Sequence, residues 1–151
     1  MILSKKLKSL LSKCNTLITY QPLSDEVDVA TIPLLKDLFT DVMCLPNDKN
    51  SDYLYWANFC RKKYVNKFVC VLVPGQTFDI FGTRHGRGRG WYDRFLSSIP
   101  KNWIRIGVAQ KSQFSVSKIT KEPWDESVDW VIVKNGSTFD IYETKNSKNH
   151  Q

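Results

Sequence analysis

Apolar and polar residues are patterned along this chain so that short strands and helices are predicted in turn. Short β-branched or continuously apolar runs are typical of strands, and they cover residues 16–20, 42–45, 67–73, 104–109 and, as the last strand, 129–133. Amphipathic or helix-favouring segments cover residues 2–13, 31–39 and 91–99. Residues 53–64 are aromatic and poorly periodic, so the pattern makes no prediction there.

The alternation of strands and helices predicts an α/β fold with a mostly parallel sheet and helices on both faces. A strand as apolar as Lys67–Val73 indicates burial on both sides of that sheet. With 151 residues and no linker-like segment, we expect a single domain over residues 1–145 and a polar tail over 146–151. The N-terminal segment contains no arginine, and we interpret it as a structural helix rather than an organelle transit peptide.

The composition narrows the range of partners and compartments. A net charge of +7 favours anionic partners such as a nucleotide, a polyanionic cofactor, nucleic acid or a membrane surface. No apolar run approaches the ~18 residues of a membrane span, so no membrane partner is expected. None of the four cysteines stands in a CxxC pair, which argues against a zinc site. Cys14, Cys44 and Cys70 lie in apolar, strand-like surroundings, which predicts buried, reduced thiols and a cytoplasmic protein.

Glycine and arginine concentrate in one segment that follows the most apolar strand. Four of the six arginines and five of the seven glycines lie there: Gly75, Gly82, Arg84, Gly86, Arg87, Gly88, Arg89, Gly90 and Arg94. Ligands of α/β folds bind at the carboxyl ends of strands. Glycine lets backbone amides form an anion nest, the following helix adds its positive end, and arginine supplies forked donors. The segment therefore predicts a phosphate-binding loop. Its spacing fits neither a P-loop nor a dinucleotide-binding fingerprint.

Alternative interpretations of this segment remain. A plain surface turn rarely gathers this many arginines, and RNA-binding Arg–Gly segments are usually long, repeated and disordered, so both are less favoured. Asp93 has two comparable interpretations, as a magnesium ligand beside the phosphates or as a carboxylate favoured by the helix N-terminus. We interpret Asp79 as part of the loop architecture, and His85 as a structural or polar contact rather than an acid or base.

The same residues carry a specific resemblance to a known family. The chain closely resembles 5-formyltetrahydrofolate cyclo-ligases, also called 5,10-methenyltetrahydrofolate synthetases, whose signature runs PGxxFDxxGxRLGxGxGYYDRxL. The matching residues are Pro74, Gly75, Phe78, Asp79, Gly82, Arg84, Gly86, Gly88, Gly90, Tyr92, Asp93, Arg94 and Leu96. His85 stands in place of Leu and Trp91 in place of the first Tyr. Residues 16–28, 42–46, 104–110 and 123–133 are also similar to segments of that family.

The resemblance implies a three-layer, NagB/RpiA-like fold and a reaction dependent on ATP and Mg²⁺. In it, 5-formyltetrahydrofolate is phosphorylated on its formyl oxygen and closes to 5,10-methenyltetrahydrofolate, releasing ADP and phosphate. ATP would be bound by Arg84, His85, Gly86, Arg87, Gly88, Arg89, Gly90, Trp91 and Tyr92. The folate would be bound by Gln21, Glu26, Arg87, Gly88, Arg89, Gly90 and Trp91. Arg84, Arg87 and Arg89 would be catalytic, and Asp93 and Asp129 would hold Mg²⁺.

Two segments, before residue 16 and between residues 47 and 66, are shorter than is usual in the family, so we expect a shortened member. Three functional hypotheses follow from different classes. The first is an active cyclo-ligase. The second is a catalytically impaired folate- or nucleotide-binding remnant of the family, and the third, less favoured, is a basic RNA-binding domain. We expect a monomer.

Overall fold

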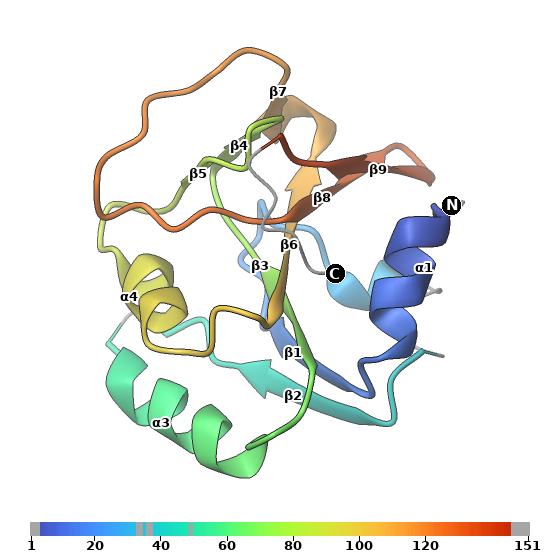
Figure 1. The fold of residues 1–151 in the computed structure, drawn as a ribbon. Coiled ribbons are helices and arrows are strands. Elements are labelled where there is room, and N and C mark those ends of the chain that lie inside the picture. Colours follow the sequence, from blue (N-terminus) through green and yellow to red (C-terminus); the bar gives the residue numbers. More distant parts are fainter. Residues whose placement is uncertain (1–3, 33–34, 36–37, 49, 146–151) are drawn as a thin grey trace.

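A six-stranded sheet forms the centre of the molecule, and its strands run in the order β2–β1–β3–β6–β8–β9 (Figure 1). The computed structural model describes residues 4–32, 35, 38–48 and 50–145. The strands are β1 (Thr16–Tyr20), β2 (Asp41–Leu45), β3 (Val69–Val73), β6 (Ile104–Gln110), β8 (Trp130–Asn135) and β9 (Thr138–Glu143). All neighbouring pairs are parallel except β8 and β9. The five predicted strands and the mostly parallel sheet are confirmed.

The expectation that the strand at 129–133 is the last one was wrong, because β9 follows it as an antiparallel edge strand. The two strands are joined by a tight turn at Gly136–Ser137, where Gly136 has a φ of 63°. A Gly-Ser pair between strand-like segments is a local signal for a hairpin, since glycine readily adopts the positive φ that the first position of such a turn requires. The sequence therefore carried the signal for β9.

Helices cover both faces of the sheet, as the sequence predicted (Figure 1). Helix α1 (Lys5–Ser12) packs Leu7, Leu10 and Leu11 on one face, against Leu72 of β3 and its neighbours. Helices α3 (Tyr53–Lys63) and α4 (Trp91–Ser97) pack on the other face, against Val69, Val71 and Val73 of β3. Because β3 alternates its side chains between two separate cores, its continuous apolar run is explained by burial on both sides.

Besides the expected helix at 2–13, whose residues 2–3 are not described, two further predicted segments bear on residues outside the described part of the chain. The expected helix at 31–39 falls partly on residues 33–34 and 36–37, and the polar tail at 146–151 lies wholly outside the described residues. Just before the first of these, Val29–Thr31 forms the short 3₁₀ helix η1.

The segment without a prediction, residues 53–64, is helix α3. The Asp52 side chain caps it by accepting a hydrogen bond from the amide of Leu54 at 2.9 Å, and Arg61, Lys62 and Lys63 lie in its last turn, where cations are favoured. Only Ala57 and Cys60 are fully buried. The outward side carries exposed aromatic residues in place of the usual polar ones, which is why the periodic signal is weak.

A second, three-stranded sheet lies within and beside the glycine-rich segment, in the order β5–β4–β7. Its strands are β4 (Thr77–Asp79), β5 (Arg84–His85) and β7 (Phe114–Ser115). The Asp79 carboxylate is fully buried and accepts hydrogen bonds from the amides of Phe81, Thr83 and Ile119, each at 2.9 Å. These contacts confirm the interpretation of Asp79 as part of the loop architecture.

The cysteines differ from the prediction at one position. All four are free thiols; Cys14, Cys60 and Cys70 are buried, whereas Cys44 is exposed. Cys44 lies on β2, an edge strand on which exposed and half-buried residues alternate, so an apolar sequence did not imply burial there. Burial raises the pKa of Cys60 to about 12, and that of Cys14 to about 11.

No helix within the described residues combines the length and the apolar character that crossing a membrane requires.

We expect Gly107→Ala to destabilise the protein because of the ring of Phe78. A Cβ atom at position 107 would lie 2.5 Å from Cε1 of the fully buried Phe78. Overpacking of this kind costs about 1–3 kcal/mol, measurable as a shift in urea unfolding. Combining Gly107→Ala with Phe78→Leu, which removes the clashing ring, should cost less than the sum of the two single changes. Additive costs would contradict the proposed contact.

Candidate functional site

A cavity of about 370 Å³ opens where the parallel strands β1, β2 and β3 end. It is lined by residues following each of these strands and by the glycine-rich segment: Gln21, Leu23, Glu26, Pro46, Asn47, Asp48, Pro74, Arg84, Gly86, Arg87, Arg89, Gly90, Trp91 and Tyr92. The carboxyl ends of parallel strands are where α/β folds bind ligands. A cavity therefore lies where the sequence analysis predicted the binding site.

The wall after β1 is shaped by hydrogen bonds within residues 20–27. The hydroxyl of the buried Tyr20 donates to the carbonyl of Val27 at 2.8 Å. The amide of Leu23 donates to Oε1 of Glu26 at 2.9 Å, so the Glu26 carboxylate is held by its own turn. Its side chain is only 6% exposed, which places a nearly buried negative charge at the cavity wall.

Arg84 is a buried cation beneath the glycine-rich loop. Its Nε donates to the carbonyl of Pro74 at 2.6 Å, and its guanidinium carbon lies 5.2 Å from the centre of the Tyr92 ring. A Cβ atom on Gly86 would lie 2.9 Å from Nη2 of Arg84, so the lack of a side chain at position 86 lets the loop pass over the guanidinium. Burial lowers the pKa of Arg84, and the Asp93 carboxylate at 3.9 Å opposes that shift.

Arg87 joins the glycine-rich loop to the segment after β1. Its guanidinium donates to both carboxylate oxygens of Asp25, at 2.9 and 2.8 Å, and to Oε2 of Glu26 at 3.3 Å. The hydrogen bond from Arg87 lowers the pKa of Asp25. Two carboxylates therefore already neutralise Arg87, so an anion binding at this guanidinium has to compete with them.

Arg89 and Gly90 form a wall shared with a second cavity of about 500 Å³. Its other lining residues are Gly88, Asp93, Arg94, Ser97, Trp124 and Glu126. Gly88 and Gly90 have φ values of 88° and 66°, which side chains rarely adopt, so glycine is needed at both positions. Arg89 is exposed and forms no ion pair within the described part of the chain.

Trp91 and Tyr92 close the first cavity from the side of α4. The Trp91 ring stacks on Phe95 at 5.4 Å, and its Nε1 donates to the carbonyl of Ser51 at 2.8 Å. Burial raises the pKa of Tyr92, which keeps its hydroxyl protonated beside Arg84. These two aromatic side chains, whose rings are tilted by 60° to each other, give the cavity a largely apolar wall.

The two carboxylates predicted to hold Mg²⁺ lie in different surroundings. Asp93 lines the second cavity, where its Oδ1 accepts a hydrogen bond from the amide of Glu126 at 3.0 Å. Burial raises its pKa, while that hydrogen bond and Arg84 act in the opposite direction. Asp129 is 1% exposed, directly precedes β8, and accepts a hydrogen bond from the amide of Arg105 at 2.9 Å. Among the described residues, no group of three or more His, Cys, Asp or Glu side chains is arranged to hold a metal ion.

His85 does not line either of these cavities. Its Nε2 contacts the carbonyl of Thr120, which confirms the interpretation of His85 as a polar contact. Its role in binding ATP stays a prediction.

The structure brings most of the predicted site residues together. The first cavity collects every residue predicted to bind the folate except Gly88, and every residue predicted to bind ATP except His85 and Gly88. The sequence analysis missed four residues of its wall: Leu23, Pro46, Asn47 and Asp48. Their position directly after β1 and β2 was the available signal, since residues after parallel strands meet at one edge of the sheet.

The family of the chain follows from its sequence match. Residues 55–134, which include the glycine-rich segment, match the model of the 5-formyltetrahydrofolate cyclo-ligase family. The chain belongs to this family. The matched residues include the loop whose Arg89 and Gly90 line both cavities described above.

Curated relatives match over part of their length. The chain is 36% identical over 67 residues to the 5-formyltetrahydrofolate cyclo-ligase of Mycoplasma genitalium, covering 44% of this chain and 39% of that protein. It is 35% identical over 79 residues to the probable 5-formyltetrahydrofolate cyclo-ligase of Caenorhabditis elegans, covering 49% of this chain and 37% of that protein. The matches thus span well under half of either relative.

Two solved structures share the fold along most of the chain. The 5,10-methenyltetrahydrofolate synthetase of Mycoplasma pneumoniae superposes with a TM-score of 0.52 at 21% identity, over 87% of this chain and 88% of that one. The enzyme of the same name from Aquifex aeolicus gives a TM-score of 0.58 at 17% identity, over 97% of this chain and 88% of that one. These likenesses establish the α/β fold.

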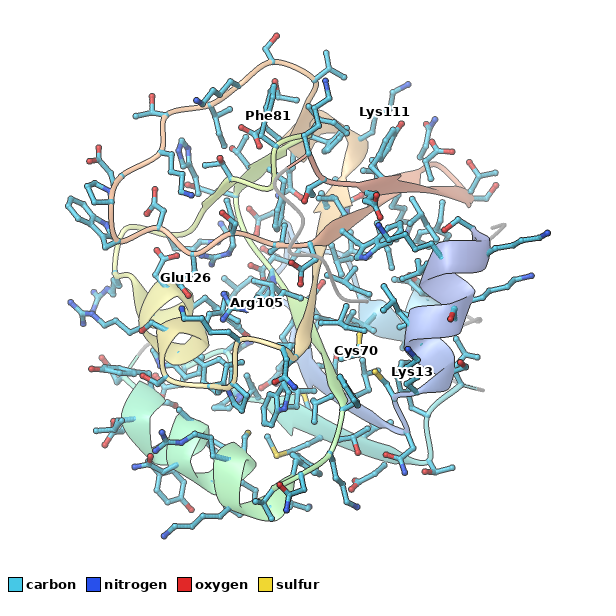
Figure 2. The ribbon with its side chains drawn as sticks, in the orientation of Figure 1. Lys13, Cys70, Phe81, Arg105, Lys111 and Glu126 are labelled. Atoms are coloured by element: carbon cyan, nitrogen blue, oxygen red, sulfur yellow. The ribbon has the colours of Figure 1, made fainter. Side chains whose placement is uncertain are left out.

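We expect Arg105→Met to destabilise the protein by about 2–4 kcal/mol, because it leaves buried polar partners unpaired. The Arg105 side chain is 1% exposed; it donates to Glu126 Oε1 at 3.0 Å and to the carbonyl of Leu96 at 2.7 Å (Figure 2 labels Arg105 and Glu126, beside α4). Urea unfolding measures the loss. Lys101→Met is the matched control, since Lys101 lies 3.8 Å from the same carboxylate with a 71% exposed side chain and should cost less than ~0.5 kcal/mol. Equal costs would contradict this account.

Proposed function

We propose that this protein converts 5-formyltetrahydrofolate to 5,10-methenyltetrahydrofolate, using ATP and Mg²⁺ and releasing ADP and phosphate. The family supports the reaction class, and the two adjoining cavities offer room for two substrates on either side of the glycine-rich loop. The whole activity is a proposal for this chain, because its curated relatives are matched over only part of their length.

One observation carries the proposal. Gln21 and Glu26, which follow β1, line the same cavity as Arg84, Arg87 and Arg89 of the glycine-rich loop. We expect the folate to contact Gln21 and Glu26, and the phosphates of ATP to contact the three arginines. The cavity thus offers one place where a formyl group and a γ-phosphate can meet. Phosphoryl transfer depends on such positioning more than on covalent participation of the protein.

The proposed reaction proceeds in two steps. The formyl oxygen on nitrogen 5 attacks the γ-phosphorus, a new O–P bond forms, and the bond between that phosphorus and the β–γ bridging oxygen breaks to release ADP. Nitrogen 10 then attacks the activated carbon and loses its proton, and the carbon–oxygen bond breaks so that phosphate leaves with the former formyl oxygen. No nucleophilic side chain is needed.

The arginines have distinct proposed roles. Arg89 is exposed and forms no ion pair within the described residues, so it is available for phosphate oxygens. Arg87 reaches phosphate only by exchanging or sharing its bonds to Asp25 and Glu26. Arg84 lies beneath the loop, donates to Pro74, and stabilises negative charge above it through the local field.

Asp93 fits a magnesium ion better than Asp129 does. Mg²⁺ usually binds through one or two carboxylates together with substrate phosphates, and Asp93 shares a cavity with Gly88, Arg89 and a second carboxylate, Glu126. Asp129 is buried and already accepts a backbone hydrogen bond, so its proposed role would require that contact to change. Bound at Asp93, the ion would neutralise charge on the transferred phosphate.

We expect the protein to form the methenyl product when ATP, Mg²⁺ and 5-formyltetrahydrofolate are all present. The product is followed by its near-ultraviolet absorbance. Omitting ATP is the negative control, because phosphorylation activates the formyl oxygen. Absence of product despite intact ATP binding would overturn the catalytic proposal and favour a binding protein that has lost turnover.

We expect Arg87→Ala combined with Arg89→Ala to weaken ATP binding by about a hundredfold, since hydrogen bonds to charged groups contribute ~1.5–3 kcal/mol each. Arg89→Ala alone should cost more than Arg87→Ala, because phosphate must compete with Asp25 for Arg87. Isothermal titration calorimetry measures both.

The charge-matched control for this pair is Arg61→Ala combined with Lys62→Ala, two exposed cations on α3 that line neither cavity. If the loop variant bound ATP as tightly as the control, the phosphate-binding role of the loop would be wrong.

A further inference from the structure

Trp124 stands apart from the other tryptophans of this chain. It is 67% exposed, whereas Trp103 and Trp130 are 2% and 3% exposed and the remaining two are half-buried. None of the aromatic pairs found among the described residues includes it. An indole is the largest apolar surface a side chain can offer, so one left uncovered at the rim of a cavity suggests a ligand with a flat face.

The turn that carries Trp124 is held in place from both sides. The amide of Asp125 donates to the carbonyl of Glu122 at 3.0 Å, and the Asp125 carboxylate accepts from the amide of Glu122 at 2.8 Å. The next residue, Glu126, is anchored by its amide to Asp93 and by its carboxylate to the buried Arg105 (Figure 2). The indole therefore extends from a preorganised turn, and ordering it for a ligand costs little conformational entropy.

The cavity beside Trp124 has the right neighbours for a nucleotide. It shares Arg89 and Gly90 with the first cavity, so a phosphate chain that lies on the loop can extend into both cavities. In the proposed function the folate occupies the first cavity, which leaves the second for the nucleoside. Arg94, which also lines this cavity, offers a planar cation for a base; its guanidinium carbon lies 5.9 Å from the centre of the Tyr53 ring.

We propose that Trp124 is the stacking platform for the nucleobase of a nucleoside triphosphate whose phosphates lie on the glycine-rich loop. The inference rests on the proposed function, since it takes the phosphates to be on that loop. Stacking on an aromatic ring tolerates any base, because every base has a π face. Trp124 thus strengthens nucleotide binding without selecting between adenine and guanine.

The test compares ATP with inorganic tripolyphosphate, which has the phosphate chain but no base. Dissociation constants for both, in Mg²⁺, are measured by calorimetry for the unaltered protein, Trp124→Ala and Trp124→Phe. We expect Trp124→Ala to weaken ATP binding about tenfold or more, and tripolyphosphate binding hardly at all. Trp124→Phe, which keeps an aromatic face, should retain most of the ATP affinity. The control is Tyr55→Ala, another exposed aromatic residue at 59%, which lines neither cavity.

The outcomes separate this inference from the proposed function. Unchanged ATP affinity in Trp124→Ala, with both ligands binding, overturns the stacking role alone. An equal loss for ATP and tripolyphosphate also overturns it, because the turn would then act on the phosphates instead of the base. Failure of the unaltered protein to bind either ligand overturns the phosphate-binding loop, and the stacking role with it. Since Trp124 is exposed, thermal melting should show all three variants folded.

Discussion

The position of the glycine-rich loop depends on the contact between Phe78 and Gly107. Gly107 lies in β6, in the middle of the main sheet, and Phe78 belongs to β4 of the small sheet. With no side chain at position 107, the phenyl ring lies directly on the backbone of β6. Next along the chain, the Asp79 carboxylate accepts hydrogen bonds from the amides of Phe81 and Thr83, in the turn between β4 and β5, and of Ile119, which follows β7. The loop that follows β5 therefore starts from a fixed point, and its arginines reach the cavities from a rigid base.

Most of the positive charge at the site is balanced by carboxylates that contact the arginines. The carboxylates of Asp25 and Glu26 face Arg87, and Asp93 lies near Arg84, so the net charge of +7 is not concentrated in unpaired form at the loop. A buried guanidinium such as that of Arg84 is tolerated because a carbonyl, an aromatic face and a carboxylate surround it. Within the described residues Arg89 forms no ion pair, and it lies on the wall common to both cavities.

The sequence predicted the parts of the fold that depend on local pattern. The strand at Val69–Val73 and the helix containing Leu7 follow from apolar runs and helical spacing, which act over a few residues. It did not predict α3, whose exposed face is aromatic, or the exposure of Cys44, which depends on β2 being an edge strand. Edge position is a property of the assembled sheet and leaves no mark on a five-residue apolar segment.

For the site, the sequence identified the loop and, through the family resemblance, Gln21 and Glu26 of the facing wall, but not the rest of that wall. Motif residues lie close together in the chain, so Arg84 and Trp91 were predicted from one segment. Pro46 and Asn47 reach the cavity only because β1 and β2 end side by side. Trp124 reaches the second cavity through the anchoring of Glu126 by Arg105 and Asp93, three residues from separate segments. The placement of Trp124 is decided by packing between distant segments, and no local pattern records it.

The bidentate pair between Arg87 and Asp25 has a consequence for which anions the cavity accepts. A single small anion that binds Arg87 has to displace the Asp25 carboxylate, which carries a similar charge. The charge balance around Arg87 therefore changes little. If the loop binds phosphates as proposed, a chain of linked phosphates that contacts both Arg87 and Arg89 would offset the carboxylate lost at Arg87 with a new partner at Arg89. By competing for Arg87, the Asp25 carboxylate would then favour ligands that bring several connected negative charges over single small anions.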